Sequence, residues 1–230
     1  KTPFYYKYID GWAALLQNIS TFILVLALVI GFLVSGIFSD EFQTKADSIF
    51  FSARFGRSRG IFAKVGAGFY ITTGFYLMFV FLYTFIVLFV LGADGASCPI
   101  QLDLWRSVYN ITFLQAYLFI VLGGYIGTIF AATLAMLASA FTHSTPTAVI
   151  VPFIVLCVFP FLSRIITLPG LCSFFPDQLL EIYLDIKEAG LITLGSKVTT
   201  IATDNALTVE VVCLIFQPIL YRVYQKVEIK

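Results

Sequence analysis

Residues 66–92 read GAGFYITTGFYLMFVFLYTFIVLFVLG, a run of 27 residues without a charged side chain. A helix needs about 20 apolar residues to cross the hydrocarbon core of a bilayer, so this run can span it with length left for tilt. Its apolar residues form a continuous run rather than a periodic stripe, which is typical of a membrane helix. The stretch therefore predicts a membrane-spanning helix.

The whole chain has the composition of a membrane protein. Its 230 residues include 60% hydrophobic and only 12% charged residues, and the mean hydropathy is +0.95. A soluble domain carries about twice that share of charge. We therefore expect an all-α membrane protein, a single polytopic helical bundle over residues 1–230. Five segments are long and apolar enough to span: 21–38, 66–92, 113–140, 146–163 and 207–224.

Two of these segments carry further signals. The 113–140 segment is rich in glycine and alanine, which lets helices approach closely and predicts a central position, although glycine is also simply common in membrane helices. Ser144 and Thr145 before Pro146 predict the start of the fourth helix, and Pro152 predicts a kink within it.

The basic residues predict which connections face the cytoplasm. They gather in the 39–65 connection and in the C-terminal tail. If the chain crosses the membrane five times, these two segments and the short 139–145 link lie on the same side. The connections 93–112 and 164–206 then lie outside. The residues that decide this are Lys45, Arg54, Arg57, Arg59, Lys64, Arg222, Lys226 and Lys230.

The same count places residues 1–20 outside. Because bacterial membrane proteins usually start inside, we expect a further helix before Lys1 and six spans in the full chain. The outer connection 164–206 predicts a short amphipathic helix over 176–188, with Asp177, Glu181 and Asp185 on one face. We favour a solvated face on the membrane surface over a landing surface for a cationic substrate.

No pattern of catalytic or metal-ligating residues occurs. The sequence has no P-loop, no H-E-x-x-H, no G-x-S-x-G and a single histidine, His143. We therefore expect no catalytic, cofactor or metal site in this chain, and no basic stripe suggests nucleic acid as a partner. Cys98 and Cys172 fall in the outer connections, where a disulfide and two unpaired thiols remain equal alternatives.

Residues 38–60, FSDEFQTKADSIFFSARFGRSRG, hold acids at one end and arginines at the other. Ser39 predicts a helix cap, with Asp40 and Glu41 in the first turn. The segment predicts an amphipathic helix on the inner membrane surface. Anionic lipid would explain the arginines but would repel the acids, so a soluble partner is the better explanation.

Here the sequence resembles the permease subunits of bacterial ABC-2 type exporters. The resemblance rests on Phe38-x-x-Glu41-x-x-Thr44, on Ser52-x-x-x-Gly56-Arg57 and on Lys64 before a long apolar span. It implies that residues 39–60 are a cytoplasmic coupling helix that docks into an ATP-binding subunit. The implied contacts to that subunit are Glu41, Thr44, Asp47, Arg54, Arg57 and Arg59. Lys45 departs from the small residue expected after the threonine.

The resemblance also implies the setting of the protein. It implies a bacterial cytoplasmic membrane, membrane lipids around the bundle, a second permease subunit, and ATP and Mg held by the partner ATPase. The implied cargo is hydrophobic or amphipathic, such as a lipid, a peptide or an antibiotic. The alternative is a non-transporting sensor or immunity component that binds another cytoplasmic partner.

Overall fold

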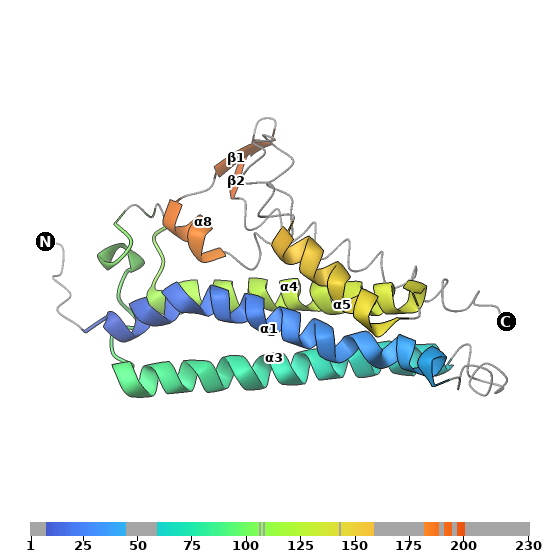
Figure 1. Ribbon diagram of the computed structural model, residues 1–230. Helices are drawn as coiled ribbons and strands as arrows, with labels where there is room; N and C mark the ends of the chain where they lie inside the picture. The colour runs from blue at the N-terminus through green and yellow to red at the C-terminus, as the bar shows by residue number, and fades with distance from the viewer. Residues whose placement is uncertain are drawn as a thin grey trace, which may run out of the picture.

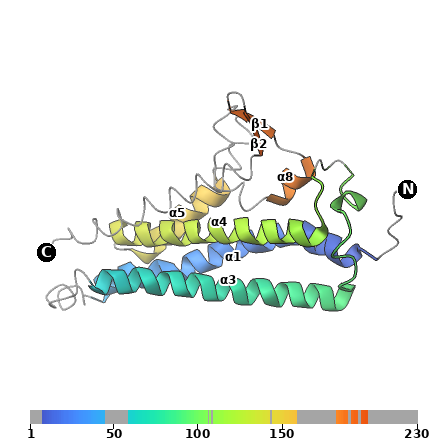
Figure 2. The ribbon, with the colours of Figure 1, turned by 180° about the vertical axis from the view of Figure 1, so that it is seen from behind.

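The computed structural model describes residues 8–44, 59–105, 107, 109–142, 144–158, 182–188, 191–194 and 197–200. Three long helices lie side by side in both views (Figure 1, Figure 2): α1 (Asp10–Gln43), α3 (Ile61–Leu91) and α4 (Phe113–Thr142). Each is long and apolar enough to cross a membrane. The chain is thus a mostly helical membrane protein.

Shorter elements flank the three long helices. They are η2 (Ile100–Leu102), α5 (Thr145–Phe153) with the π-helical turn η3 (Ile154–Val158), α8 (Ile182–Glu188), and the strands β1 (Leu191–Leu194) and β2 (Lys197–Thr200). The two strands pair antiparallel, with Leu191 opposite Thr200. In Figure 1 α5 lies along one end of α1 and α4, and α8 lies near the other end.

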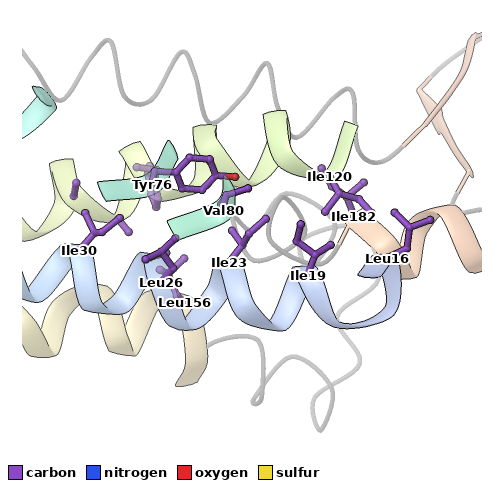
Figure 3. Packing of buried hydrophobic residues seen from close by; sticks show 14 of the residues in the cluster. Leu16, Ile19, Ile23, Leu26, Ile30, Tyr76, Val80, Ile120, Leu156 and Ile182 are labelled. Atoms are coloured by element: carbon purple, nitrogen blue, oxygen red, sulfur yellow. The ribbon is translucent and has the colours of Figure 1, made fainter. Parts of the chain in front are cut away.

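The core follows one face of α1. Figure 3 shows Ile19, Ile23 and Leu26 pointing toward Ile120 of α4 and Tyr76 of α3. All five side chains are buried. Residues three and four apart share one face of a helix, so this spacing gives α1 a continuous apolar stripe against its neighbours.

The central position predicted for 113–140 is confirmed. In the most apolar stretch of α4, 61% of the residues are buried, against 11% in that of α3. Small residues form most of the buried face and let α1 and α3 approach. The predicted glycines and alanines are all buried: Gly123, Gly124, Gly127, Ala131, Ala132, Ala135 and Ala138. α3 is therefore peripheral: Tyr76 points into the core, whereas Phe81, Phe85 and Phe89 are largely exposed.

At one end of the bundle the start of α1 meets the end of α3. The indole nitrogen of Trp12 donates a hydrogen bond to the Ala93 carbonyl at 2.9 Å. A Cβ on Gly11 would lie 2.1 Å from the Gly92 carbonyl oxygen, so only glycine fits there. Gly92, which ends α3, has φ +93° and ψ 141°, a backbone conformation that favours glycine.

α8 covers the same end of the bundle. Ile182 and Ile186 are buried in the core cluster. Burial, together with the nearby Asp103 carboxylate, raises the pKa of Tyr183. Only Ile182–Glu188 of the helix predicted over 176–188 lies within the described residues, and that part is helical. Cys98 is buried and has a free thiol in the structure, whereas Cys172 lies outside the described residues.

The prediction for the first span was too short, and the helix cap predicted at Ser39 is wrong. α1 begins at Asp10 and continues through Ser39 to Gln43. Trp12, Leu15 and Ile19 extend the buried stripe toward the start of the chain, so packing continues the helix beyond the most apolar stretch. Ser39 is buried against α5, and this packing carries α1 past the serine.

The fourth predicted helix starts at Thr145 as expected, with Pro146 in its first turn. After Pro152 the helix becomes the π-helical turn η3, in agreement with the expected interruption. The predicted span 207–224 lies outside the described residues. The hairpin was not predicted, although Gly195 and Ser196 separate two short stretches rich in β-branched residues, a known hairpin signal.

Candidate partner-binding site

The ends of three helices meet where the charged segment leaves the bundle. α1 ends at Gln43, α3 begins at Ile61, and α5 begins at Thr145 (Figure 1). The polar side chains of these ends contact one another across the helices. The described residues of the 39–65 and 139–145 connections thus lie at the same end of the bundle, as their predicted placement on one side of the membrane requires.

An ion pair joins α1 to α3. Lys64 Nζ lies 2.7 Å from Glu41 Oε1, and the two side chains are 15% and 20% exposed. Lys64 Nζ also lies 5.3 Å from the centre of the Phe38 ring, within range of a cation–π interaction. The ammonium group therefore has an acidic and an aromatic partner on α1.

The positions of these charges in their helices are unfavourable by themselves. Glu41 lies in the last turn of α1 and Lys64 in the first turn of α3. The helix dipole disfavours an acid at a C-terminus and a base at an N-terminus. Pairing the two charges offsets both effects, so the ion pair stabilises the two helix ends only while they stay together.

A second group of contacts joins α1 to α5 through the Thr145 hydroxyl. Ser39 Oγ lies 2.6 Å from Thr145 Oγ1, and Gln43 Nε2 donates to the same oxygen at 2.8 Å. Thr145 Oγ1 donates to Asp40 Oδ1 at 3.4 Å. A hydroxyl has one hydrogen and two lone pairs, so these three bonds use the full capacity of Thr145.

Gly36 provides the space in which the Asp40 carboxylate lies. A Cβ at Gly36 would come within 2.8 Å of Asp40 Oδ2 and 3.0 Å of Oδ1. The carboxylate thus folds back along α1, where its Oδ1 accepts the bond from Thr145. A larger residue at position 36 would displace this acceptor.

The described part of the predicted contact set comprises Glu41, Thr44 and Arg59. Glu41 pairs within the chain, Thr44 is exposed and donates to the Asp40 carbonyl at 2.7 Å, and Arg59 is exposed just before α3. The structure therefore brings Glu41 to Lys64, and the Thr44 hydroxyl also lies 3.4 Å from the Glu41 carbonyl oxygen. Asp47, Arg54 and Arg57 lie outside the described residues, so their contacts stay a prediction.

Sequence reasoning missed the roles of Ser39, Gln43 and Thr145. The sequence pattern predicts a cap at Ser39 and, at Thr145, only the start of a helix. No local signal joins them, because 106 positions separate Ser39 from Thr145. The usable signal is polar residues at the facing ends of neighbouring spans, where an apolar surrounding favours mutual hydrogen bonds.

Comparisons with protein-family models, with curated proteins and with solved structures found no match. Within the residues that the structure describes, no three His, Cys, Asp or Glu side chains gather in a way that could hold a metal ion. The polar cluster formed by Ser39, Asp40, Glu41, Gln43, Lys64 and Thr145, here called the junction, is therefore the candidate site. Its arrangement suits mechanical coupling between helices.

Proposed function

We propose that this chain is the membrane-spanning permease subunit of an ATP-binding-cassette exporter. In this proposal residues 39–60 bind a separate ATPase subunit, which holds ATP and Mg. The bundle lies in a bacterial cytoplasmic membrane, together with a second permease subunit. The resemblance of residues 38–64 to such permeases supports this proposal.

The observation that carries the proposal is the junction itself. The charged segment leaves α1 after Glu41 and returns to α3 before Lys64, and these two residues form an ion pair. The same end of α1 bonds to the first residue of α5. A partner that displaces the segment would thus act on three helices at once.

Such a linkage suits energy transfer from a soluble protein. Helices are stiff elements, so a displacement at one end moves the whole helix rather than a loop. An anchor to anionic lipid would need basic residues but no bonded junction between three helices. The junction therefore favours a partner that pushes or pulls on the segment.

The exposed surface of α3 supports the proposal that the cargo is hydrophobic or amphipathic. The rings of Phe81, Phe85 and Phe89 stack along this helix, and all three are more than half exposed. They line a groove of about 570 Å³ that reaches Gly92 and Ala93. A lipid, peptide or antibiotic cargo would contact this apolar surface before the rest of the bundle.

Co-purification tests the proposal. The tagged full chain is extracted in mild detergent from its native membrane, and ATPase activity is measured in the eluate. Arg57→Glu should abolish the co-purifying activity, because it reverses a charge in the segment. Lys226→Glu is the matched control, since it makes the same charge change in the C-terminal tail, and it should retain the activity.

Arg57→Glu is a cleaner test than Glu41→Lys, because Glu41 also pairs with Lys64 inside the chain. Absence of ATPase from the wild-type eluate in several detergents would contradict the proposal. A different soluble protein lost only with Arg57→Glu would instead favour the sensor or immunity alternative.

A further inference from the structure

α5 is fixed at its first residue and interrupted seven residues later. Thr145 bonds to Ser39, Gln43 and Asp40 of α1. Pro152 has no backbone N–H and so cannot bond the Ala148 carbonyl. The backbone then forms the π-helical turn η3, a feature frequent at functional sites in helices.

Between these two points the contact of α5 with α1 is incomplete. A cavity of about 150 Å³ lies between them, lined by Leu28, Gly31, Val149, Ile150, Pro152 and Phe153. A Cβ at Gly31 would lie 3.9 Å from Pro152 Cβ, so a methyl group would fit there. Side chains that line a void lose dispersion contacts on one side. On the side that faces α1, the bonds of Thr145 therefore take the place of part of the side-chain packing.

Beyond the interruption the helix is packed again. Leu156 is 2% exposed and belongs to the core cluster with residues of α1. The segment 145–151 thus lies between a hydrogen-bonded end and a packed turn, with the cavity on its α1 side and Ala148 as its buried residue. Such an arrangement permits movement of the first segment while the second stays in place.

We infer that the Thr145 hydroxyl is a latch that holds the first two turns of α5 on α1, and that this segment turns about Pro152–Val158 when the latch opens. Opening separates α5 from α1 and enlarges the cavity beside Gly31. The inference goes beyond the proposed function and does not depend on it, since it concerns helices of this chain alone.

The latch is placed where it can open. Asp40 and Gln43 are exposed, so water can replace their bonds to Thr145. A hydrogen bond that exchanges with water contributes little net free energy, although several together hold a geometry. Movement of the end of α1 would break all three bonds at once, because they end on one oxygen atom.

Amide hydrogen exchange of the full chain in detergent tests the latch. Thr145→Val keeps the shape of the side chain and removes the hydroxyl, whereas Thr145→Ser keeps the hydroxyl. We expect Thr145→Val to raise exchange of residues 147–151 by about tenfold, the effect of roughly one or two net hydrogen bonds. Residues 155–158 and the buried half of α4 should keep their wild-type rates, and Thr145→Ser should resemble wild type.

Each other outcome overturns the inference. Unchanged exchange in Thr145→Val would mean that the hydroxyl does not hold α5. An equal rise in Thr145→Ser would assign the effect to the lost methyl group. A rise that extends through 155–158 or into α4 would indicate general loosening of the bundle rather than a turn about Pro152–Val158.

Discussion

At the scale of single residues, Gly124 sets the distance between α1 and α4. A Cβ at this position would lie 2.7 Å from Ile23 Cγ2 and 3.1 Å from the Tyr76 hydroxyl. Ile23 is β-branched and has one preferred rotamer in a helix, so it cannot move aside cheaply. The close approach of the two helices therefore requires glycine.

We predict that Gly124→Ala destabilises the bundle by about 1–3 kcal/mol, the usual cost of overpacking a core. Gly74 in α3 is the matched control, because a Cβ there would have no atom within 4 Å. Gly74→Ala should leave the thermal unfolding midpoint in detergent unchanged or raise it slightly, since alanine favours the helix. Equal midpoints for the two variants would contradict the packing at Gly124.

Tyr76 provides a second residue-scale prediction. Its side chain is fully buried, and its hydroxyl donates to the Val121 carbonyl at 2.7 Å. Tyr76→Phe should cost about 0.6 kcal/mol, the average for hydrogen bonds between membrane helices, and at most about 1.7 kcal/mol. Tyr70, 78% exposed, supplies the control, and Tyr70→Phe should leave stability unchanged in the same unfolding measurement. An equal loss of stability in both variants would show that removal of any tyrosine hydroxyl lowers stability, and it would contradict a specific contribution from the Tyr76–Val121 hydrogen bond.

These residue-level features were only partly predictable. The glycines and alanines of 113–140 indicated a central helix, because small residues mark close helix contacts. The partner of Tyr76 was not predictable. It depends on the rotation of α3 about its axis, and an almost uniformly apolar sequence leaves that rotation open.

At the scale of elements, the ion pair between Glu41 and Lys64 holds the ends of α1 and α3 together. Glu41→Lys should cost about 1.5–3 kcal/mol, the range for hydrogen bonds to charged groups. Lys64→Glu should cost a similar amount. The double exchange Glu41→Lys with Lys64→Glu should recover most of the loss, because it restores opposite charges. Unfolding free energies of the four proteins form a double-mutant cycle that checks this.

Additive losses in that cycle would contradict a direct interaction between the two side chains. Recovery in the double exchange should also be incomplete. The exchange places a lysine in the last turn of α1 and an acid in the first turn of α3, which suits both dipoles, but it removes the stacking of Lys64 on Phe38.

The elements differ in how well the sequence predicted them. The start of α5 at Thr145 and its interruption after Pro152 followed from proline chemistry alone. The end of α1 did not, because Ser39 with Asp40 and Glu41 has the pattern of a helix start. Contact with α5 outweighs this local preference, and contacts between distant segments are not visible in a local pattern.

At the scale of the whole molecule, the three long helices give the bundle two distinct ends. Asp94 lies just after α3 at one end, and Thr44 follows α1 at the other. The basic residues predict that the second end is cytoplasmic. With the four native cysteines replaced by serine, we predict that a membrane-impermeant maleimide labels Asp94→Cys in intact cells and labels Thr44→Cys only after permeabilisation. Labelling of both positions from outside would contradict the prediction that the two ends of the bundle lie on opposite sides of the membrane. Labelling of Thr44→Cys alone would mean that the end of the bundle with Thr44, rather than the end with Asp94, faces outward.

The central claim is that residues 39–60 bind an ATPase subunit, and site-specific photo-crosslinking in the native membrane tests it most directly. A photoreactive amino acid replaces Arg57 in one protein and, in another, the exposed Trp105, which lies at the end of the bundle away from the junction. The account predicts that position 57 crosslinks to a protein with a nucleotide-binding cassette, identified by mass spectrometry, and that position 105 does not. Crosslinks from position 57 only to lipid or to proteins without such a cassette would contradict the account.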